Sequence, residues 1–443
     1  MKINSKKLLS FSIARALTIC LVMSLFLYTL PQYRIIPLIS IETFGLGALI
    51  VLASCIYIAD SGRVNKGILL FGLILTIVNI FSQLMSPFPP TAQFYKILFL
   101  GICFVFITDY FVRINPIMQS ALKAHIALTL ILFLYGSYIY IVGDIEGTQT
   151  TDEGWKSVGR YWGFRYTVST RNDDLFYIVP SCLILLNYAL FSNSRAVKIL
   201  SYAMFFMLTI AIFLSFSRGH ILSMFIAAIT CVLLKMQSPI FINGKWVYKN
   251  RYKAYFKIVF ALIGVIFLGI LSISILAIYI PEFNILLNLG LKLLSIVNPE
   301  AQSEALNMTS SNAARINIYF IGFDLMSKYP LGVGAENFQY ASMAEGHGRY
   351  WGENTYLEYL VGFGIFGGLI IPMLLVYPVI KLYYMYKKNQ GFLNLTYLTV
   401  SFYIAIAALF NVLIGNLYFY IWLATIYSHI IYQKRQKKLL NNA

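Results

Sequence analysis

Two arginines of the sequence stand at positions where a fixed positive charge could bind an anion or a polar partner. Arg218 lies in the segment LSFSRGHILS, between two apolar runs with almost no connecting loop, and Arg315 lies near the start of an expected helix. A charge next to membrane segments is costly, so it normally faces a polar cavity or a fixed partner. The free N–H groups of a helix start and a guanidinium can bind the same phosphate. Arg315 is therefore a candidate for binding an anion such as a phosphate, and Arg218 a candidate for facing a polar cavity.

Both arginines also have a simpler explanation. Arg218 is close to a helix end, from which its side chain can reach the membrane interface. Arg315 can pair with a nearby carboxylate or with a lipid headgroup. The sequence leaves these alternatives open beside the catalytic one.

His347 and Glu353 stand close together just before an apolar run, and each is a candidate for the general base of a transfer reaction. Either side chain suits proton abstraction at the membrane edge, where desolvation raises the pKa of a carboxyl group. His347 can equally be a solvent-exposed loop histidine. The sequence has no acidic cluster of the DxD type, which disfavours a metal-dependent nucleotide-sugar transferase. We expect neither a metal nor a cofactor.

The elements that must position these residues are membrane helices. Residues of the AVILMFWYC set make up 59% of the 443-residue chain, and 12% are charged, against roughly 25% in an average globular protein. A chain of this composition cannot cover a soluble surface, which excludes a cytoplasmic enzyme, a disulfide-stapled secreted domain and a disordered scaffold. The five cysteines lie inside apolar runs and show no metal-binding or disulfide spacing.

Apolar runs long enough to cross a bilayer, about 20 residues each, predict an all-α fold. We expect a polytopic transmembrane helical bundle of about 12 spans, which forms a single integral membrane domain over residues 1–443. The predicted spans are 8–30, 35–59, 67–86, 94–113, 117–142, 175–192, 197–217, 219–236, 256–280, 355–380, 393–414 and 416–432.

Two connections are long, and we expect both on the outer face: a first outer loop at 143–174 and a large outer catalytic loop at 281–354. In the larger loop, Gly332 and Gly334 predict a tight turn. Polar residues of these loops are candidates for substrate binding. They are Arg160, Arg165, Arg171 and Asn172 in the first loop, and His347, Arg349 and Asn354 in the second.

The large outer loop should also contain short helices. Residues 284–297 suit an amphipathic helix that lies on the membrane surface. Further along, Ser311 or Asn312 can cap a helix that carries Arg315 in its first turn and stops at Pro330.

The net charge of +17 has two competing explanations, nucleic-acid binding and membrane orientation. With both chain ends in the cytoplasm, the twelve spans place 23 Lys and Arg and 2 Asp and Glu inside, and 11 Lys and Arg and 15 Asp and Glu outside. The resulting charges of +21 inside and −4 outside follow the positive-inside rule. No nucleic-acid motif accompanies the basic clusters, so we expect no nucleic-acid partner.

Four motifs resemble the O-antigen polymerase and O-antigen ligase family, the Wzy-type bacterial membrane glycosyltransferases. They are SRG at 217–219, the arginine-bearing helix followed by PLGVGAENF at 330–338, ENTYLEYLVGFGIFGG at 353–368, and GRYWGFRYTVSTRNDDLF at 159–176. Asn354, Gly364 and Gly367 fit the spacing of the ligase branch, whose preceding histidine is replaced here by Glu353. The resemblance covers roughly residues 155–370.

The resemblance implies transfer of a glycan from an undecaprenyl-diphosphate donor at the outer face of the bacterial cytoplasmic (inner) membrane. It implies that Arg218 and Arg315 hold the donor diphosphate and that residue 353 activates the acceptor hydroxyl. Because Glu353 replaces the histidine, a polymerase that lengthens a surface polysaccharide is favoured, with a new lipid-linked repeat unit as acceptor. Whether a chain-length regulator also binds is left open.

Two alternatives stand beside the polymerase. An O-antigen ligase would move the glycan onto lipid A core or protein. A flippase would transport the lipid-linked oligosaccharide, and a transporter should show paired discontinuous helices and mid-membrane charges in both halves. The polar residues here are instead concentrated in two outer loops, which favours an enzyme.

Overall fold

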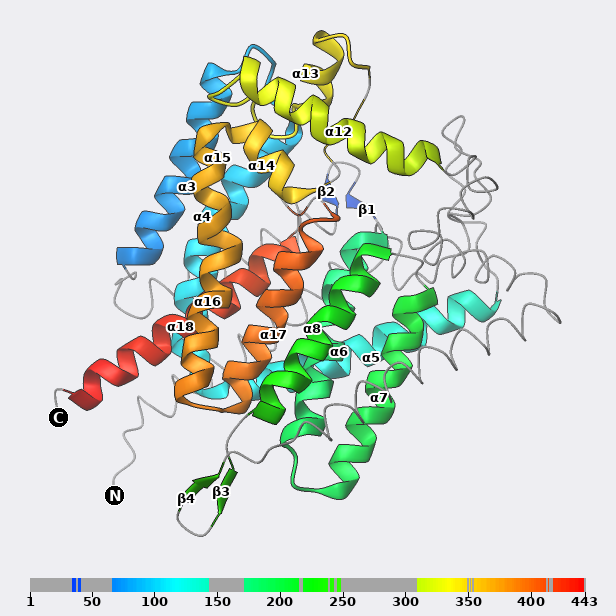
Figure 1. The fold of residues 1–443 in the computed structure, drawn as a ribbon, viewed down its shortest axis with the longest axis vertical. Helices are drawn as coiled ribbons and strands as arrows, with labels where there is room; N and C mark the ends of the chain where they lie inside the picture. The colour runs from blue at the N-terminus through cyan, green and yellow to red at the C-terminus, as the bar shows by residue number, and fades with distance from the viewer. Residues whose placement is uncertain are drawn as a thin grey trace. The chain divides into compact units, whose positions relative to one another are not determined.

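The structure, a computed structural model, is predominantly helical in the part of the chain that it describes (Figure 1). The described residues are 34–36, 39–40, 66–142, 171–214, 218–237, 240–242, 245–247, 309–348, 350, 352, 354–411, 413 and 417–441. Contacts between residues divide the chain into two compact units. One consists of residues 1–155, 163–229 and 321–443, and the other of residues 156–162 and 230–320. The prediction of a single integral membrane domain stays a prediction.

The first group of helices runs from residue 66 to residue 237. Its members are α3 (Lys66–Met85), α4 (Ala92–Ile114), a 3-10 turn (Asn115–Ile117), α5 (Met118–Val142), α6 (Arg171–Phe191), α7 (Arg195–Leu214) and α8 (Arg218–Gln237). Thr91 caps α4, because its side chain accepts a hydrogen bond from Phe94 N. The helix ends at Ile114 and continues directly into the 3-10 turn, because Asn115 keeps a helical conformation ahead of Pro116.

The second group of helices begins at residue 309. Its members are α12 (Thr309–Lys328), α13 (Phe338–Ala344), α14 (Thr355–Phe363), α15 (Ile365–Ile371), the π-helical turn η6 (Pro372–Val376), α16 (Tyr377–Lys388), α17 (Phe392–Ala407) and α18 (Leu417–Asn441). In the first unit, α4 packs against α3 and α18, α6 packs against α7 and α17, and α16 packs against α17 and α18 (Figure 1).

Two small antiparallel hairpins depart from the all-α prediction. One pairs β1 (Arg34–Ile36) with β2 (Ile39–Ser40), and the other pairs β3 (Ile240–Ile242) with β4 (Lys245–Val247). The first hairpin occupies the start of the predicted span 35–59, where the sequence contains Pro37, so that this span does not begin as a helix there. In the second, Ile242 pairs with Lys245 across the dipeptide Asn-Gly, which favours a two-residue hairpin connection.

Eight helices, α3 to α8, α17 and α18, each begin within four residues of a predicted span. Four described segments are long and apolar enough to cross a membrane: Lys66–Met85, Arg195–Ile212, Gly219–Met236 and Ile365–Lys388. Large apolar side chains on α3 and α7 are exposed, whereas α6 is buried along most of its length. Exposed apolar faces of this size suit contact with lipid. The count of twelve spans and the orientation of the chain ends stay predictions, and the spans 8–30 and 256–280 lie outside the described residues.

The predicted span 355–380 is not one continuous helix. It is broken at Gly364, whose φ is +58°, and again by the π-helical turn that begins at Pro372. A positive φ ends an α-helix, and a proline lacks the N–H that the preceding turn requires. The short helix α14 is therefore separate from the crossing segment Ile365–Lys388.

Candidate active site

The N-terminus of α8 is fixed against a turn formed by residues 408–411. Arg218 is the first residue of α8. A Cβ added at Gly219 would lie 2.5 Å from Phe410 Cβ, so only a glycine allows this close approach. One residue later, the buried His220 shares a hydrogen bond of 2.7 Å between its Nδ1 and the hydroxyl of Tyr403. These contacts place the backbone of Arg218 beside the turn.

The N-terminus of α14 is fixed to the same turn. Thr355 N donates to the carbonyl oxygens of Ala408 and Asn411, at 2.9 and 3.0 Å. The Thr355 hydroxyl donates to Asn411 O at 2.6 Å and accepts from Leu413 N at 2.9 Å. All of these groups are buried, where unmade hydrogen bonds are costly. We call this set of contacts the buried junction.

Asn354 is the N-cap of α14. Its Oδ1 accepts a hydrogen bond of 2.7 Å from Leu357 N, and the residue is buried. This is the ordinary way in which an asparagine stabilises a helix start. Glu353 immediately precedes this cap in the sequence. Through the buried junction, the N-termini of α8 and α14 are both held against the turn 408–411, and helix N-termini favour anions.

The predicted turn at Gly332 and Gly334 is confirmed, because both have positive φ angles of +99° and +85°. The turn lies along α14: Val333 N donates to Val361 O, and Gly334 N donates to Gly362 O, both at 3.0 Å. A Cβ at Gly332 would lie 2.4 Å from Gly362 O. The turn is therefore held by the backbone and has no room for a side chain.

Polar side chains of the connection between α3 and α4 hold the other side of this turn. The Ser86 hydroxyl donates to Val333 O, and the Thr91 hydroxyl donates to Ala335 O at 3.0 Å. Asn337 Nδ2 donates to Val333 O at 2.9 Å. The turn at 332–337 is thereby tied to both α3 and α14.

The two motif glycines that follow α14 are required by packing. A Cβ at Gly364 would lie 2.2 Å from Pro330 O, and one at Gly367 would lie 1.8 Å from Tyr359 O. Asn354, Gly364 and Gly367 thus shape and anchor α14. The substrate-binding role predicted for Asn354 stays a prediction.

An ion-pair cluster joins α12 to the segment that follows α13. His347 Nε2 lies 2.7 Å from Asp324 Oδ2, and Lys328 Nζ lies 2.9 Å from the same oxygen. Lys328 Nζ also lies 2.7 Å from Glu345 Oε2, and the Tyr329 hydroxyl donates to Glu345 Oε1 at 2.6 Å. About a third of the His347 and Asp324 side chains is exposed, so the pair can reach a substrate.

Lys328 and the carboxylates of Asp324 and Glu345 stabilise one another's charged forms. The hydrogen bond from His347, followed by that from Lys328, lowers the pKa of Asp324 below its usual range. The hydrogen bonds from Lys328 and Tyr329 lower the pKa of Glu345, and those to Glu345 and Asp324 raise the pKa of Lys328. An ionised Asp324 can orient the His347 ring, as a base requires of its supporting carboxylate.

One carboxyl group near the site went unnoticed in the sequence. Glu358 of α14 is buried, and its Oε2 has no hydrogen-bond partner among the described residues. A Cβ at Gly352 would lie 2.1 Å from Glu358 Oε1, so the carboxyl group packs against the residue that precedes Glu353. An acid within the apolar stretch TYLEYLVGF was the available signal, because such residues are usually functional or paired. Asp324 was also missed, since nothing in the sequence relates it to His347.

The other predicted site residues are distributed as follows. Arg315 lies in the second turn of α12, because the helix begins at Thr309 and ends at Lys328. The predicted caps at Ser311 and Asn312 are therefore wrong, because both residues lie inside the first turn of α12, and the helix ends two residues before the predicted stop at Pro330. Arg171 and Asn172 open α6, ahead of the predicted start at 175. Arg160, Arg165, Arg349, Glu353 and the surface helix 284–297 lie outside the described residues.

The decisive comparison is with known protein families. Residues 203–371 match the O-antigen ligase family model. This segment includes the start of α8, all of α12 and the motif from Asn354 to Gly367, so the resemblance noted in the sequence is confirmed over it. A comparison with curated proteins gives no match. The match supports a glycosyltransferase-like enzyme of the O-antigen ligase or polymerase type in a bacterial membrane.

Proposed function

We propose that the protein is the polymerase of a bacterial surface polysaccharide. It transfers the growing glycan from undecaprenyl diphosphate to a new lipid-linked repeat unit at the outer face of the cytoplasmic membrane. The observation that carries the proposal is the buried junction: Arg218 opens one helix held there, and Glu353 directly precedes the cap of the other. A cation and a carboxyl group at neighbouring helix N-termini suit the leaving group and the base of one transfer reaction.

The two arginines neutralise the leaving diphosphate. Arg218 does so from the first residue of α8, and Arg315 from the second turn of α12. As the anomeric C–O bond breaks, negative charge develops on the diphosphate, and fixed cations stabilise it more strongly in the transition state than in the bound donor. No metal is needed for this role.

Glu353 accepts the proton of the acceptor hydroxyl as the hydroxyl oxygen forms the new glycosidic bond. The acceptor attacks the anomeric carbon on the side opposite the diphosphate, which leaves as undecaprenyl diphosphate. A single displacement of this kind inverts the configuration of the anomeric carbon. Retention of configuration in the product linkage would contradict it.

His347 is the competing base. Its hydrogen bond to Asp324 has the geometry of a base oriented by a carboxylate. If His347 is the base, then His347→Gln abolishes transfer and Asp324→Asn weakens it, while Glu353→Gln stays active. If Glu353 is the base, Glu353→Gln abolishes transfer and His347→Gln does not. Comparison of the chain lengths made by the two variants decides between them.

An O-antigen ligase is the second candidate function, because the matching family model carries that description. A deletion strain separates the two functions. Surface material one repeat long would support the polymerase. Loss of both long and short surface glycan, with lipid-linked polymer accumulating, would support the ligase.

The catalytic roles are tested by single alanine substitutions in a strain that lacks the native gene copy. Arg218→Ala, Arg315→Ala and Glu353→Ala should each lower the rate of chain extension by about 10²- to 10³-fold, the usual cost of losing one charge-stabilising group or base. Arg195→Ala, at the exposed start of α7, is the matched control and should leave chain length unchanged. Normal extension by Arg315→Ala at equal protein level would overturn the diphosphate clamp.

A further inference from the structure

A cavity of about 910 Å³ lies between α3, α4, α16 and α18, all in the first unit. Gly67 and Ile68 of α3 line it, whereas Gln83, near the other end of α3, lies against Gly334 of the candidate active site. At a rise of about 1.5 Å per residue, these two positions on α3 are about 24 Å apart. The cavity is therefore a separate site.

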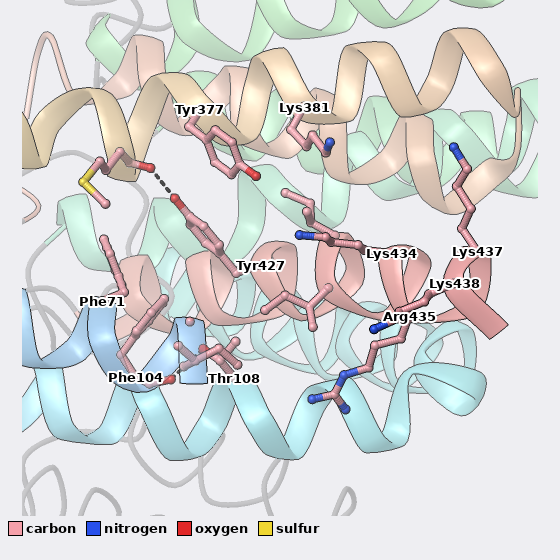
Figure 2. A pocket seen from close by; sticks show the side chains of 15 residues that line it. Phe71, Phe104, Thr108, Tyr377, Lys381, Tyr427, Lys434, Arg435, Lys437 and Lys438 are labelled. Carbon is pink, nitrogen blue, oxygen red and sulfur yellow. Dashed lines mark hydrogen bonds between the residues drawn. The ribbon is translucent and has the colours of Figure 1, made fainter. Parts of the chain in front are cut away.

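One end of the cavity is aromatic. The ring centroid of Phe71 lies 5.5 Å from that of Phe104 and 5.8 Å from that of Tyr427. Tyr377 stacks on Tyr427 at 6.2 Å, and the Tyr427 hydroxyl donates to the backbone carbonyl of Met373 (Figure 2). This wall suits a hydrocarbon chain because it offers apolar ring faces. The Tyr427 hydroxyl at its centre is already hydrogen-bonded within the protein.

The other end of the cavity is cationic. Lys381 of α16 lines it together with four residues of the last turns of α18, Lys434, Arg435, Lys437 and Lys438 (Figure 2). No carboxylate is among the lining residues, and none of these five cations forms an ion pair within the part of the chain that the structure describes. A concentration of positive charge without any acidic partner calls for an anion.

We propose that this cavity binds one anionic phospholipid of the surrounding bilayer. The phosphate lies among Lys381, Lys434 and Arg435, and an acyl chain lies along Phe71 and Phe104. The charge of the cationic end and the apolar character of the aromatic end match the two parts of such a lipid. A soluble anion would leave the aromatic wall without a partner, and a zwitterionic lipid would leave the cations poorly neutralised. The predicted cytoplasmic position of the end of α18 places the site in the inner leaflet.

The bound lipid connects α18 to α3, α4 and α16. A ligand that binds only the folded state stabilises it by an amount that grows with the logarithm of its concentration over its dissociation constant. We therefore expect phosphatidylglycerol to raise the thermal unfolding temperature of the purified full-length protein in detergent and to remain bound in native mass spectrometry. Phosphatidylcholine and glycerol phosphate should do neither.

The variant Lys381→Gln/Lys434→Gln/Arg435→Gln should bind phosphatidylglycerol about 100-fold more weakly, because each cation near an anionic lipid contributes about 5-fold. The matched control is Lys123→Gln/Arg195→Gln/Lys198→Gln, which removes three exposed cations of α5 and α7 that do not line the cavity. The control should bind as the unaltered protein does. Lys381→Arg/Lys434→Arg keeps the charge and should also retain the lipid.

Three outcomes would overturn the proposal. Equal binding of phosphatidylcholine would show a site for acyl chains alone. Equal protection by glycerol phosphate would show a site for soluble anions. Unchanged phosphatidylglycerol binding in the triple variant would show that the cations play no part. If the triple variant does not fold, Lys381→Gln alone must weaken binding about 5-fold, and an unchanged dissociation constant in that variant would equally contradict the site.

Discussion

The buried junction and the ion-pair cluster hold the segment between α12 and α14 by opposite means. At the junction, Thr355 makes its hydrogen bonds to backbone groups, and all the atoms involved are withdrawn from solvent. In the cluster, His347 and Asp324 are partly exposed and joined by a side-chain hydrogen bond of 2.7 Å. Buried neutral hydrogen bonds give a rigid support, whereas exposed ionisable groups can gain and lose protons. The junction therefore positions the chain, and the cluster is free to take part in chemistry.

The largest expected effect is at Gly364. Gly364→Ala puts a Cβ 2.2 Å from Pro330 O and forces an L-residue to a φ of +58°, so we expect a loss of about 3–5 kcal/mol in the free energy of unfolding. Gly346→Ala is the matched control: its φ is +77°, but nothing lies within 4 Å of the added Cβ. It should lose about 1 kcal/mol, the cost of the backbone conformation alone. Thermal unfolding in detergent measures both; equal losses would show that packing at Gly364 is unimportant.

The next largest effect is at Thr355. Thr355→Val keeps the shape of the side chain but leaves Leu413 N and Asn411 O each without one hydrogen bond, which should cost about 2 kcal/mol. Thr399→Val is the control, because its buried hydroxyl donates only to Leu395 O within its own helix. The control should lose less than about 1 kcal/mol. If Thr355→Val is as stable as Thr399→Val, the hydroxyl hydrogen bonds of the junction contribute no more to stability than one within a helix.

A smaller effect is expected at the cap. Asn354→Ala should cost about 1 kcal/mol of stability, the usual value for an N-cap, while Asn354→Asp keeps a side-chain oxygen for Leu357 N and should cost much less. Unfolding curves of the two variants test the cap, and chain-length analysis tests substrate binding. If Asn354→Asp is as stable as the parent but inactive, the amide group contacts the substrate.

The smallest stability effect is expected in the ion-pair cluster. The pKa values of Asp324 and Glu345 are lowered in the folded protein, so their contribution is present above the ordinary carboxyl pKa and is lost as pH falls through the lowered values. We expect the cluster to weaken below about pH 4. Lys328→Gln should reduce this acid dependence and lower the stability at pH 7 by the same amount, which is small because the groups are exposed. An unaltered acid profile in Lys328→Gln would contradict the role of the ion pairs.

The positions of eight helices could be predicted from the sequence, because apolar length is a local property of the chain. The starts of α3 to α8, α17 and α18 were predicted to within four residues. The turn at Gly332 and Gly334 was also predicted, since glycine is the residue that tolerates a positive φ. The break at Gly364 was missed, because the apolar run continues through it without interruption.

The sequence by itself determined that this is a helical membrane protein and that its motifs resemble the O-antigen ligase and polymerase family. Composition and short motif spacings can be read from the sequence without knowledge of the fold. Only the tertiary structure decided which groups meet. His347 contacts Asp324, Thr355 contacts Asn411, and the cations of α18 line the same cavity as the aromatic rings of α3 and α4. These partners are far apart in the sequence, and their encounter depends on helix packing, which no local pattern encodes.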